Sequence, residues 1–288
     1  MNLTRRSNTK GLVGLLLHAG SLILCGFLIA AQIPGWQFLV IALGILMVFL
    51  FTLLHETSHR TPFHSKVLNI VVSWICGFIV LVPPNWFRYF HFQHHRHTQD
   101  PKRDPELQSG KPESMLQYCW HVTGLPVWYG QIKTLLINAA GRCSDRYVPA
   151  SAAQVVRLES IVILSGYAIA SVFLIYTGHT HVLVVWFSAL FCGQPFLRLY
   201  LMAEHSRCPF VDDMFRNTRT VFTNRLVRLV AWNMPYHAEH HAYPNIPFFN
   251  LPLFHQMVKD NLQVTSNGYS EFHRESINAV KCLSLIHI

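Results

Sequence analysis

Residues 11–55 read GLVGLLLHAGSLILCGFLIAAQIPGWQFLVIALGILMVFLFTLLH and contain no Asp, Glu, Lys or Arg. An apolar run of this length can cross the roughly 30 Å hydrocarbon core of a bilayer twice. It is interrupted near Gln32, Pro34 and Gly35, where a turn would fall. A second uncharged run, residues 160–197, is interrupted by polar residues 177–181. The two runs predict an all-α integral membrane protein with four transmembrane helices in two hairpins.

The composition supports a membrane protein. Of the 288 residues 51% are hydrophobic and only 13% are charged, whereas about 25% of residues are charged in a typical soluble domain. The first apolar segment exceeds the roughly 7–15 residues of a signal-peptide core, so we expect it to be retained. The seven cysteines include no CxxC pair, and we expect no disulfides. No linker or repeat is visible, so we treat residues 1–288 as a single domain.

The basic residues indicate an orientation. Arg5, Arg6 and Lys10 precede the first span, the Arg-rich residues 216–228 follow the fourth, and neither hairpin turn contains Lys or Arg. The positive-inside rule places both termini and the long loop of residues 56–159 in the cytoplasm. The net charge of +9 can attract anionic lipid, an acidic electron carrier or an acidic head group on that side. We do not expect nucleic-acid binding.

Two further apolar stretches are too short or too mixed to be ordinary spans. Residues 67–82 fall short of a comfortable crossing and end at Pro83 and Pro84, which predicts a re-entrant or interfacial helix. Residues 114–141 combine Trp and Tyr with apolar residues, a pattern typical of helices at the headgroup layer. We therefore expect interfacial helices beside a cytosolic, histidine-rich cap.

The 18 histidines include three groups at helical spacing. Residues three and four apart share a helix face, so each group can direct several imidazoles at one point. Eight neutral imidazoles exceed the needs of a four-coordinate zinc site, and imidazole also suits iron, copper and nickel. Two metal ions are therefore implied. The members of the groups are His55, His59, His91, His94, His95, His237, His240 and His241.

These motifs resemble a known family. HETSH at 55–59, HFQHH at 91–95 and HAEHH at 237–241 are similar to the three histidine boxes of the membrane fatty-acid desaturase and hydroxylase superfamily. The resemblance extends from His55 to about Pro252, and His205 in LYLMAEHSR matches a ninth ligand of that family. It implies a non-haem site of two Fe, O2 as co-substrate, and desaturation of a lipid or acyl chain.

Three departures from the family's pattern argue against two of its subgroups, the acyl-CoA desaturases and the front-end desaturases. Leu201 stands where acyl-CoA desaturases often have Asn, His237 stands where front-end desaturases have Gln, and no HPGG motif is present. The chain also has no nucleotide fingerprint and no haem or iron–sulfur ligand set of its own. We therefore expect electrons from a separate donor, such as ferredoxin or cytochrome b5 with its reductase.

Four carboxylates lie beside or between the histidines, namely Glu56, Asp100, Asp104 and Glu239. Neutral imidazoles do not offset the charge of two metal ions, and a carboxylate that accepts the outer N–H of a ligand orients it and raises its basicity. We predict this role for the four residues. The alternative is that each is an ordinary surface carboxylate.

Other functions are less well supported by the pattern. A carotenoid or other lipid hydroxylase or ketolase would share the same metal site. HETSH also fits HExxH, so His55, Glu56 and His59 could serve an intramembrane zinc protease, which would leave the other clusters unused. The remaining histidines are expected to have structural or solvated roles, and His97 is expected not to be a ligand because it lies on another helix side. They are His18, His64, His97, His121, His179, His181, His255, His273 and His287.

Overall fold

The computed structural model describes residues 2–108 and 110–286, with side chains as far as residue 282. Four helices are long and apolar enough to cross a membrane: α1 (Asn8–Ala30), α2 (Trp36–His59), α7 (Ala153–Tyr176) and α8 (Thr180–His205). They coincide with the four predicted spans. Sheet in the described part is limited to two parallel two-residue strands, β1 (Thr220–Val221) and β2 (Thr265–Ser266). The prediction of an all-α membrane fold is confirmed.

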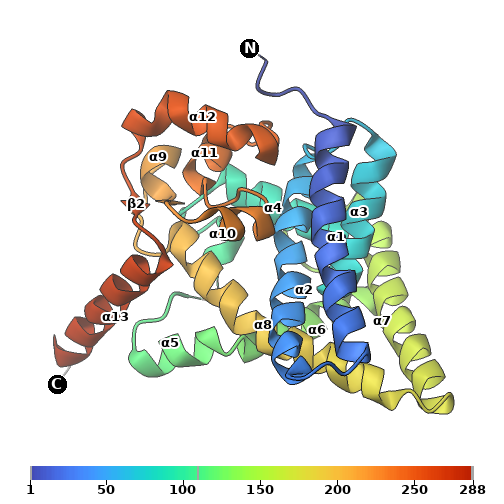
Figure 1. The fold of residues 1–288 in the computed structure, drawn as a ribbon. Coiled ribbons are helices and arrows are strands. Elements are labelled where there is room, and N and C mark those ends of the chain that lie inside the picture. The colour runs from blue at the N-terminus through green and yellow to red at the C-terminus, as the bar shows by residue number, and fades with distance from the viewer. Residues whose placement is uncertain (1, 109, 287–288) are drawn as a thin grey trace.

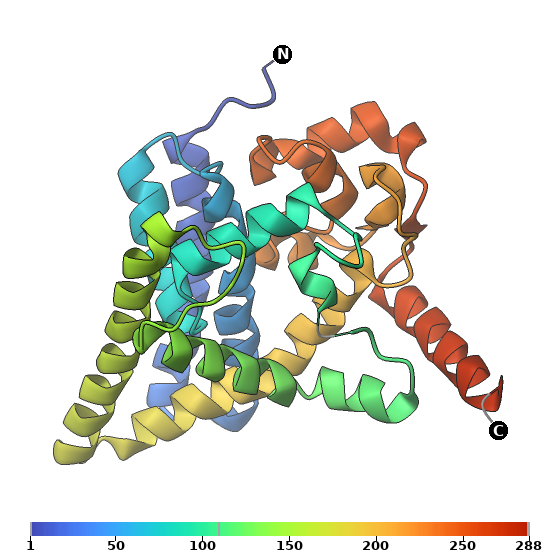
Figure 2. The ribbon, with the colours of Figure 1, turned by 180° about the vertical axis from the view of Figure 1, so that it is seen from behind.

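Helices α2 and α8 cross at the centre of the molecule, with α1 packed on α2 and α7 farther out (Figures 1 and 2). Glycines permit this crossing. A Cβ atom on Gly44 would lie 2.0 Å from the carbonyl oxygen of Ala189, and one on Gly193 would lie 2.2 Å from the carbonyl oxygen of Gly44. Neither position can carry a side chain without separating the two helices.

The segment predicted to be re-entrant or interfacial forms a sharply bent helix pair. Helix α3 (Lys66–Ile79) and helix α4 (Pro84–Arg96) meet at 97°. Leu81 adopts a left-handed φ of 60° at the bend, and Pro84 occupies the first turn of α4, where its missing N–H costs nothing. This bend gives α4 a direction different from that of α3. The geometry fits either a broken span or a re-entrant loop.

Shorter helices complete the chain. Helices α5 (Met115–Val122) and α6 (Leu125–Ala139) lie crosswise to the spans (Figure 2) and expose Leu116, Trp120 and Tyr129, as expected of interfacial helices. A cap forms over one end of α8 (Figure 1) from α9 (Met214–Asn217), α10 (Arg225–Val230), α11 (His237–Ala242) and α12 (Leu251–Val258). The last helix is α13 (Tyr269–Ile286), and the 3₁₀ turns are Pro105–Leu107, Ala150–Ala152, Phe248–Asn250 and Lys259–Asn261.

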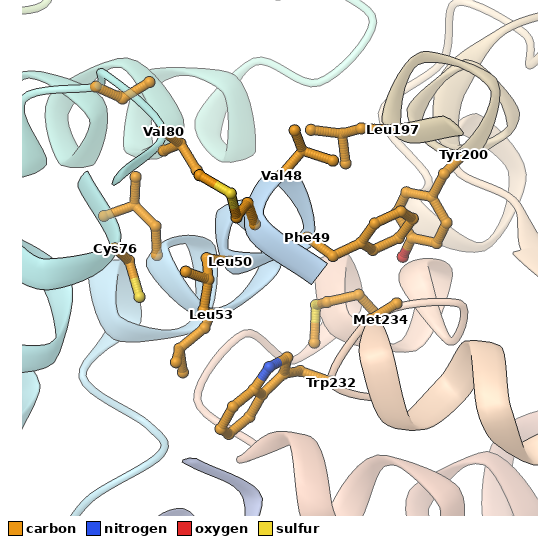
Figure 3. Packing of buried hydrophobic residues seen from close by; sticks show 14 of the residues in the cluster. Val48, Phe49, Leu50, Leu53, Cys76, Val80, Leu197, Tyr200, Trp232 and Met234 are labelled. Atoms are coloured by element: carbon orange, nitrogen blue, oxygen red, sulfur yellow. The ribbon is translucent and has the colours of Figure 1, made fainter. Parts of the chain in front are cut away.

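The apolar core surrounds α2 and includes buried residues of α3, α4, α8 and the cap. Figure 3 shows Leu53 of α2 beside Trp232 and Met234, which come from the turn before α11. The indole Nε1 of Trp232 donates to Nδ1 of His18 over 3.1 Å, and Nε2 of His18 lies 2.8 Å from the carbonyl oxygen of Leu46. His18 therefore bridges α1, α2 and the cap, a structural role that agrees with its assignment from the sequence.

Candidate metal centre

The nine predicted ligand histidines lie together at the end of α2 and α8, beneath the cap. They come from the last turns of α2, from one face of α4, from the last residue of α8 and from α11. Side-chain nitrogens form two groups in which all ligand atoms lie within 4.8 Å of one another. One group contains five histidines and the other three: His55, His59, His91, His95 and His240, then His94, His205 and His241.

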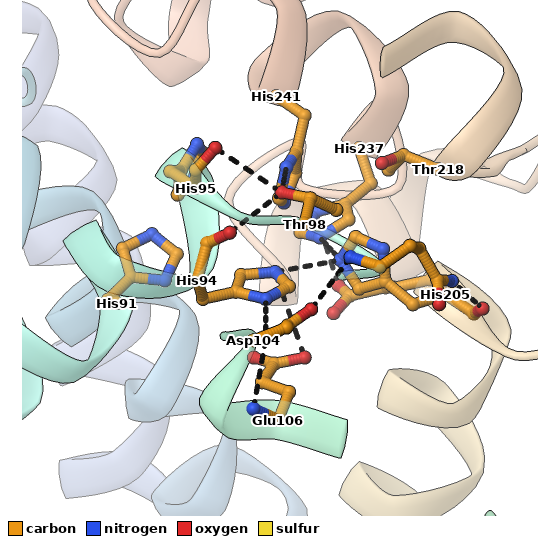
Figure 4. Close-up of polar contacts among 12 residues, drawn as sticks. His91, His94, His95, Thr98, Asp104, Glu106, His205, Thr218, His237 and His241 are labelled. Atoms are coloured by element: carbon orange, nitrogen blue, oxygen red, sulfur yellow. Dashed lines mark hydrogen bonds and ion pairs between the residues drawn. The ribbon is translucent and has the colours of Figure 1, made fainter. Parts of the chain in front are cut away.

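His237 joins the smaller group through short nitrogen contacts. Nε2 of His205 lies 3.1 Å from Nε2 of His237 and 3.1 Å from Nε2 of His94. In the larger group, Nε2 of His59 lies 2.8 Å from Nε2 of His91. Figure 4 shows His94, His205, His237 and His241 directed at one another from α4, α8 and α11. Segments far apart in the sequence thus place their imidazoles in one buried cluster.

The donor set fits metal ions. Several ring nitrogens are buried without a hydrogen-bond partner, among them both nitrogens of His55 and of His240 and Nε2 of His95 and His241. A buried unpaired polar atom costs roughly 1–3 kcal/mol, and a bound metal would remove part of that cost by accepting the one available lone pair of each neutral ring. Burial lowers the pKa of His240 and His241 well below 6.5, so both rings are neutral and able to coordinate at neutral pH.

Two of the four predicted carboxylates approach candidate ligands. Oδ1 of Asp104 accepts a hydrogen bond from Nδ1 of His94 over 2.9 Å, and its Oδ2 accepts from the backbone N–H of Gln99 over 2.8 Å. Because a carboxylate only accepts, this contact leaves Nε2 of His94 free to bind metal. Glu56 is fully buried, and its Oε1 lies 3.8 Å from Nδ1 of His240.

The other two predicted carboxylates make their contacts elsewhere. Asp100 binds its sequence neighbour Arg103 at 2.6 Å near the surface and contacts no histidine in the described part of the chain. Glu239 faces away from its neighbours His237 and His240, because its carboxylate binds His255 of α12 and the hydroxyl of Thr220 in β1. Glu239 therefore anchors α11 to the rest of the cap.

Two carboxylates near the cluster and one histidine of the cap were not predicted from the sequence. Oε1 of Glu204 lies 3.5 Å from Nδ1 of His237, and Oε2 of Glu106 lies 3.7 Å from Nε2 of His94. Glu204 directly precedes His205, which was an available signal. His255, expected to have no special role, is the buried partner of Glu239, and nothing in its spacing indicates this.

The remaining expectations for histidines agree with the geometry where the structure describes them. His97 caps the end of α4 and belongs to neither nitrogen group, and His64 is exposed. Tyr118 binds Nδ1 of His273 over 2.7 Å, which ties α5 to α13. His287 lies outside the described residues.

Two charged residues outside the boxes hold the helices that carry the histidines. Glu159 of α7 accepts hydrogen bonds from the backbone N–H and the side-chain amide of Asn85 over 2.9 and 2.6 Å, so it caps the first turn of α4. Arg219 donates through Nη1 to the carbonyl oxygens of Ala203 and Ser206, each over 2.7 Å. It thereby satisfies the C-terminus of α8 beside His205.

A cavity leads to the histidine cluster. Its inner part, about 340 Å³, is lined by apolar side chains such as Phe51 and Phe87 and by five of the clustered histidines: His55, His91, His94, His205 and His237. An outer cavity of about 780 Å³ adjoins it and shares Trp86, Val127 and Gln131 with it. The outer cavity therefore lies beside α5 and α6, and the inner cavity that adjoins it borders the histidines.

Comparisons with known proteins agree with this arrangement. Residues 34–273 match the family model described as fatty acid desaturase. The chain is 25% identical over 256 residues to a dihydrorhizobitoxine desaturase of Bradyrhizobium elkanii, covering 81% of this chain and 68% of that protein. It is 24% identical over 241 residues to a sphingolipid delta(4)-desaturase of Drosophila melanogaster, covering 78% of this chain and 68% of that protein. It is 22% identical over 219 residues to a zeaxanthin 4-ketolase of Chlamydomonas reinhardtii, covering 73% of this chain and 43% of that protein.

Proposed function

Because the chain belongs to the fatty acid desaturase family, we propose that it is an O2-dependent membrane oxidoreductase that converts an unactivated C–H pair of an acyl or similar lipid chain into a double bond. The observation that carries this proposal is the convergence of three distant histidine boxes and His205 on one buried cluster. Iron fits the neutral nitrogen donors, and two bound irons would supply the activation of dioxygen that such an oxidation requires.

We assign the following roles to residues of this chain. The five-histidine group would hold one iron, and His94, His205, His237 and His241 would hold the other. Asp104 keeps the proton of His94 on Nδ1 and so fixes its orientation. Phe51, Phe87 and the other apolar residues of the inner cavity would exclude bulk water and hold a C–H pair near the histidines.

A second candidate within the family is hydroxylation or ketone formation on a carotenoid or another lipid. The zeaxanthin ketolase among the relatives favours keeping this candidate. Expression in a host of simple lipid composition, followed by mass spectrometry of its lipids and pigments, separates the two. A new double bond supports desaturation, and added oxygen supports the alternative.

The zinc protease fits the geometry less well. Oε2 of Glu56 accepts hydrogen bonds from Thr61 and from the backbone N–H of Phe248 over 2.9 and 3.1 Å, whereas a general base must reach a metal-bound water. His55 and His59 also share their nitrogen group with histidines of both other boxes. An HExxH site would leave those histidines without a purpose.

We also propose that the histidine-bearing ends of α2 and α8 face the cytoplasm and receive electrons from a separate carrier such as ferredoxin or cytochrome b5 with its reductase. The distribution of Lys and Arg supports this orientation. Purified protein given only NAD(P)H and substrate should be inactive, and addition of a carrier and its reductase should restore turnover. Full turnover without a carrier would contradict the proposal.

Metal analysis combined with a His-to-Ala series tests the centre itself. The purified protein should contain about two irons per chain, and replacing His94 or His240 should lower both iron content and activity. His97→Ala and His64→Ala are matched controls, because neither ring belongs to a nitrogen group. A single zinc per chain, retained when His94, His95, His240 and His241 are all replaced, would overturn the proposal.

A further inference from the structure

The inner cavity contains an arginine whose side chain has no hydrogen-bond partner in the described part of the chain. Arg198 of α8 lines this cavity, and its Nε atom is buried without a hydrogen-bond partner. Within the described residues, no carboxylate oxygen lies within 4.0 Å of its guanidinium. A buried charge is costly unless it is paired and hydrogen-bonded. The desaturation chemistry proposed above makes no use of this cation.

The other charged groups of the cavity are already engaged. The carboxylates of Glu106 and Glu204 lie 3.7 and 3.5 Å from ring nitrogens of His94 and His237. Both also act electrostatically on Arg198, but from more than 4.0 Å away, so neither fills its N–H groups. Nζ of Lys111 donates to Oε1 of Gln99 and to the carbonyl oxygen of His205, each over 3.0 Å. Within the part of the chain that the structure describes, the N–H groups of Arg198 thus remain open to an acceptor on a molecule in the cavity.

The position of Arg198 relative to the histidines defines a molecular length. Arg198, Leu201, Met202 and His205 all line the cavity, and their spacing puts them on one face of α8. Arg198 and His205 are separated by seven residues, about 10 Å along the helix. The side chains between them, Leu201 and Met202, are apolar. The wall of the cavity therefore offers a cation, then an apolar stretch, then the candidate metal centre.

We propose that Arg198 binds an anionic group of the substrate, a carboxylate or a phosphate, and that the substrate is an amphiphile whose reacting carbons lie several methylenes from that group. Guanidinium matches both anions with two parallel N–H···O bonds. A second polar side chain of the cavity, Gln131, has a buried oxygen without a partner. This oxygen is an acceptor, so it would pair with a hydroxyl or an N–H of the ligand and not with its anionic group. The inference rests on the proposed function for the reaction, but the binding step does not depend on it.

Equilibrium binding tests the inference with full-length protein in phosphatidylcholine nanodiscs. The probes are radiolabelled palmitate, hexadecyl phosphate and the neutral methyl palmitate. Arg198→Gln should weaken binding of the preferred anion about 10- to 100-fold, the range expected for a charge-assisted hydrogen bond, and should leave methyl palmitate unchanged. Arg198→Lys should restore part of the affinity, because lysine keeps the charge but cannot donate two parallel hydrogen bonds to the anion. Preference for palmitate assigns a carboxylate, and preference for hexadecyl phosphate assigns a phosphate.

A matched control is Arg157→Gln, which removes an exposed arginine of α7 whose Nε donates to the carbonyl oxygen of Ala139. It should bind all three probes like the unmodified protein. Three outcomes would overturn the inference. Arg198→Gln could lose affinity equally for the acid, the phosphate and the ester, the unmodified protein could bind all three equally, or it could bind neither anion. Iron content is measured on the same samples. Normal anion discrimination without iron would contradict the proposed function alone, and two irons without discrimination would contradict this inference alone.

Discussion

The four candidate spans are alike in sequence but differ in position. Their mean hydropathies are 2.3 for α1, 2.7 for α2, 2.0 for α7 and 1.6 for α8. Yet 61% of the apolar window of α2 is buried inside the protein, against 28% for α8 and 17% for α1 and for α7. The central pair, α2 and α8, carries His55, His59 and His205, while α1 and α7 carry no candidate ligand. Hydropathy thus identifies spans but does not show which of them build the site.

The largest expected effect comes from separating the central pair. Gly44→Leu or Gly193→Leu should prevent folding, because a Cβ at either position already overlaps backbone atoms of the partner helix. Gly20→Leu in α1 is the control, since nothing lies within 4 Å of a Cβ there. Size-exclusion profiles and thermal melts of the purified variants measure the difference. Folded Gly44→Leu protein with normal iron content would show that the crossing is not required.

One histidine from a central span and one from an outer span test the difference between the two kinds of span. His205→Ala in α8 should lower iron content and abolish activity, because His205 belongs to the smaller nitrogen group. His18→Ala in α1 should destabilise the protein by about 1–3 kcal/mol, since it leaves the indole N–H of Trp232 buried without its partner. Its iron stoichiometry should stay normal. Iron analysis beside denaturant unfolding distinguishes the two, and equal iron loss in both variants would remove the distinction.

The contact between Glu159 and Asn85 is where a peripheral span supports the site. Glu159→Gln in α7 should weaken the cap of α4 and cost about 1 kcal/mol of stability, with a modest fall in iron affinity. Ser165→Ala, an exposed position on the same helix, is the control. Thermal melts and competitive chelation report the two effects. An unchanged iron affinity would confine the role of α7 to stability.

The smallest expected effect is the response of chelator-treated protein to mild acid. Burial holds the pKa of His240 and His241 well below 6.5 in the folded protein, whereas the unfolded chain takes up protons near pH 6.5. The free energy of opening α11 should therefore fall as the pH drops below about 6.5 and level off above it. Hydrogen exchange between about pH 7.5 and about pH 6 should show loss of protection in α11 and little change in α1 and α7. Uniform loss across all helices would contradict a local effect.

Several features were predictable because they depend on short-range sequence properties. Uncharged apolar runs mark spans whatever the rest of the chain does, since no charged side chain is tolerated at low cost in hydrocarbon. The spacing of three and four residues in the histidine boxes puts the rings on one helix face before any tertiary contact forms. The positions of the four candidate spans and the grouping of the box histidines follow from these two rules.

Other features depend on how distant segments meet, and the two aspartates after the second box show why. Asp100 and Asp104 are four residues apart in one polar loop, and nothing in their sequence context separates them. The chain turns at Gln99, with a φ of 65°, and this turn directs Asp104 toward His94 and leaves Asp100 near the surface. The same holds for Glu239, which meets His255 of another helix.

The sequence by itself determined which segments enter the membrane and which imidazoles can act together, because both depend on composition and helical period. Tertiary structure alone decided that α2 and α8 cross through Gly44 and Gly193. It also decided which carboxylates approach the histidines and that Arg198 lines the inner cavity without a hydrogen-bond partner. The physical reason is that burial and pairing of a polar group depend on atoms contributed by other elements, and local sequence does not specify those atoms.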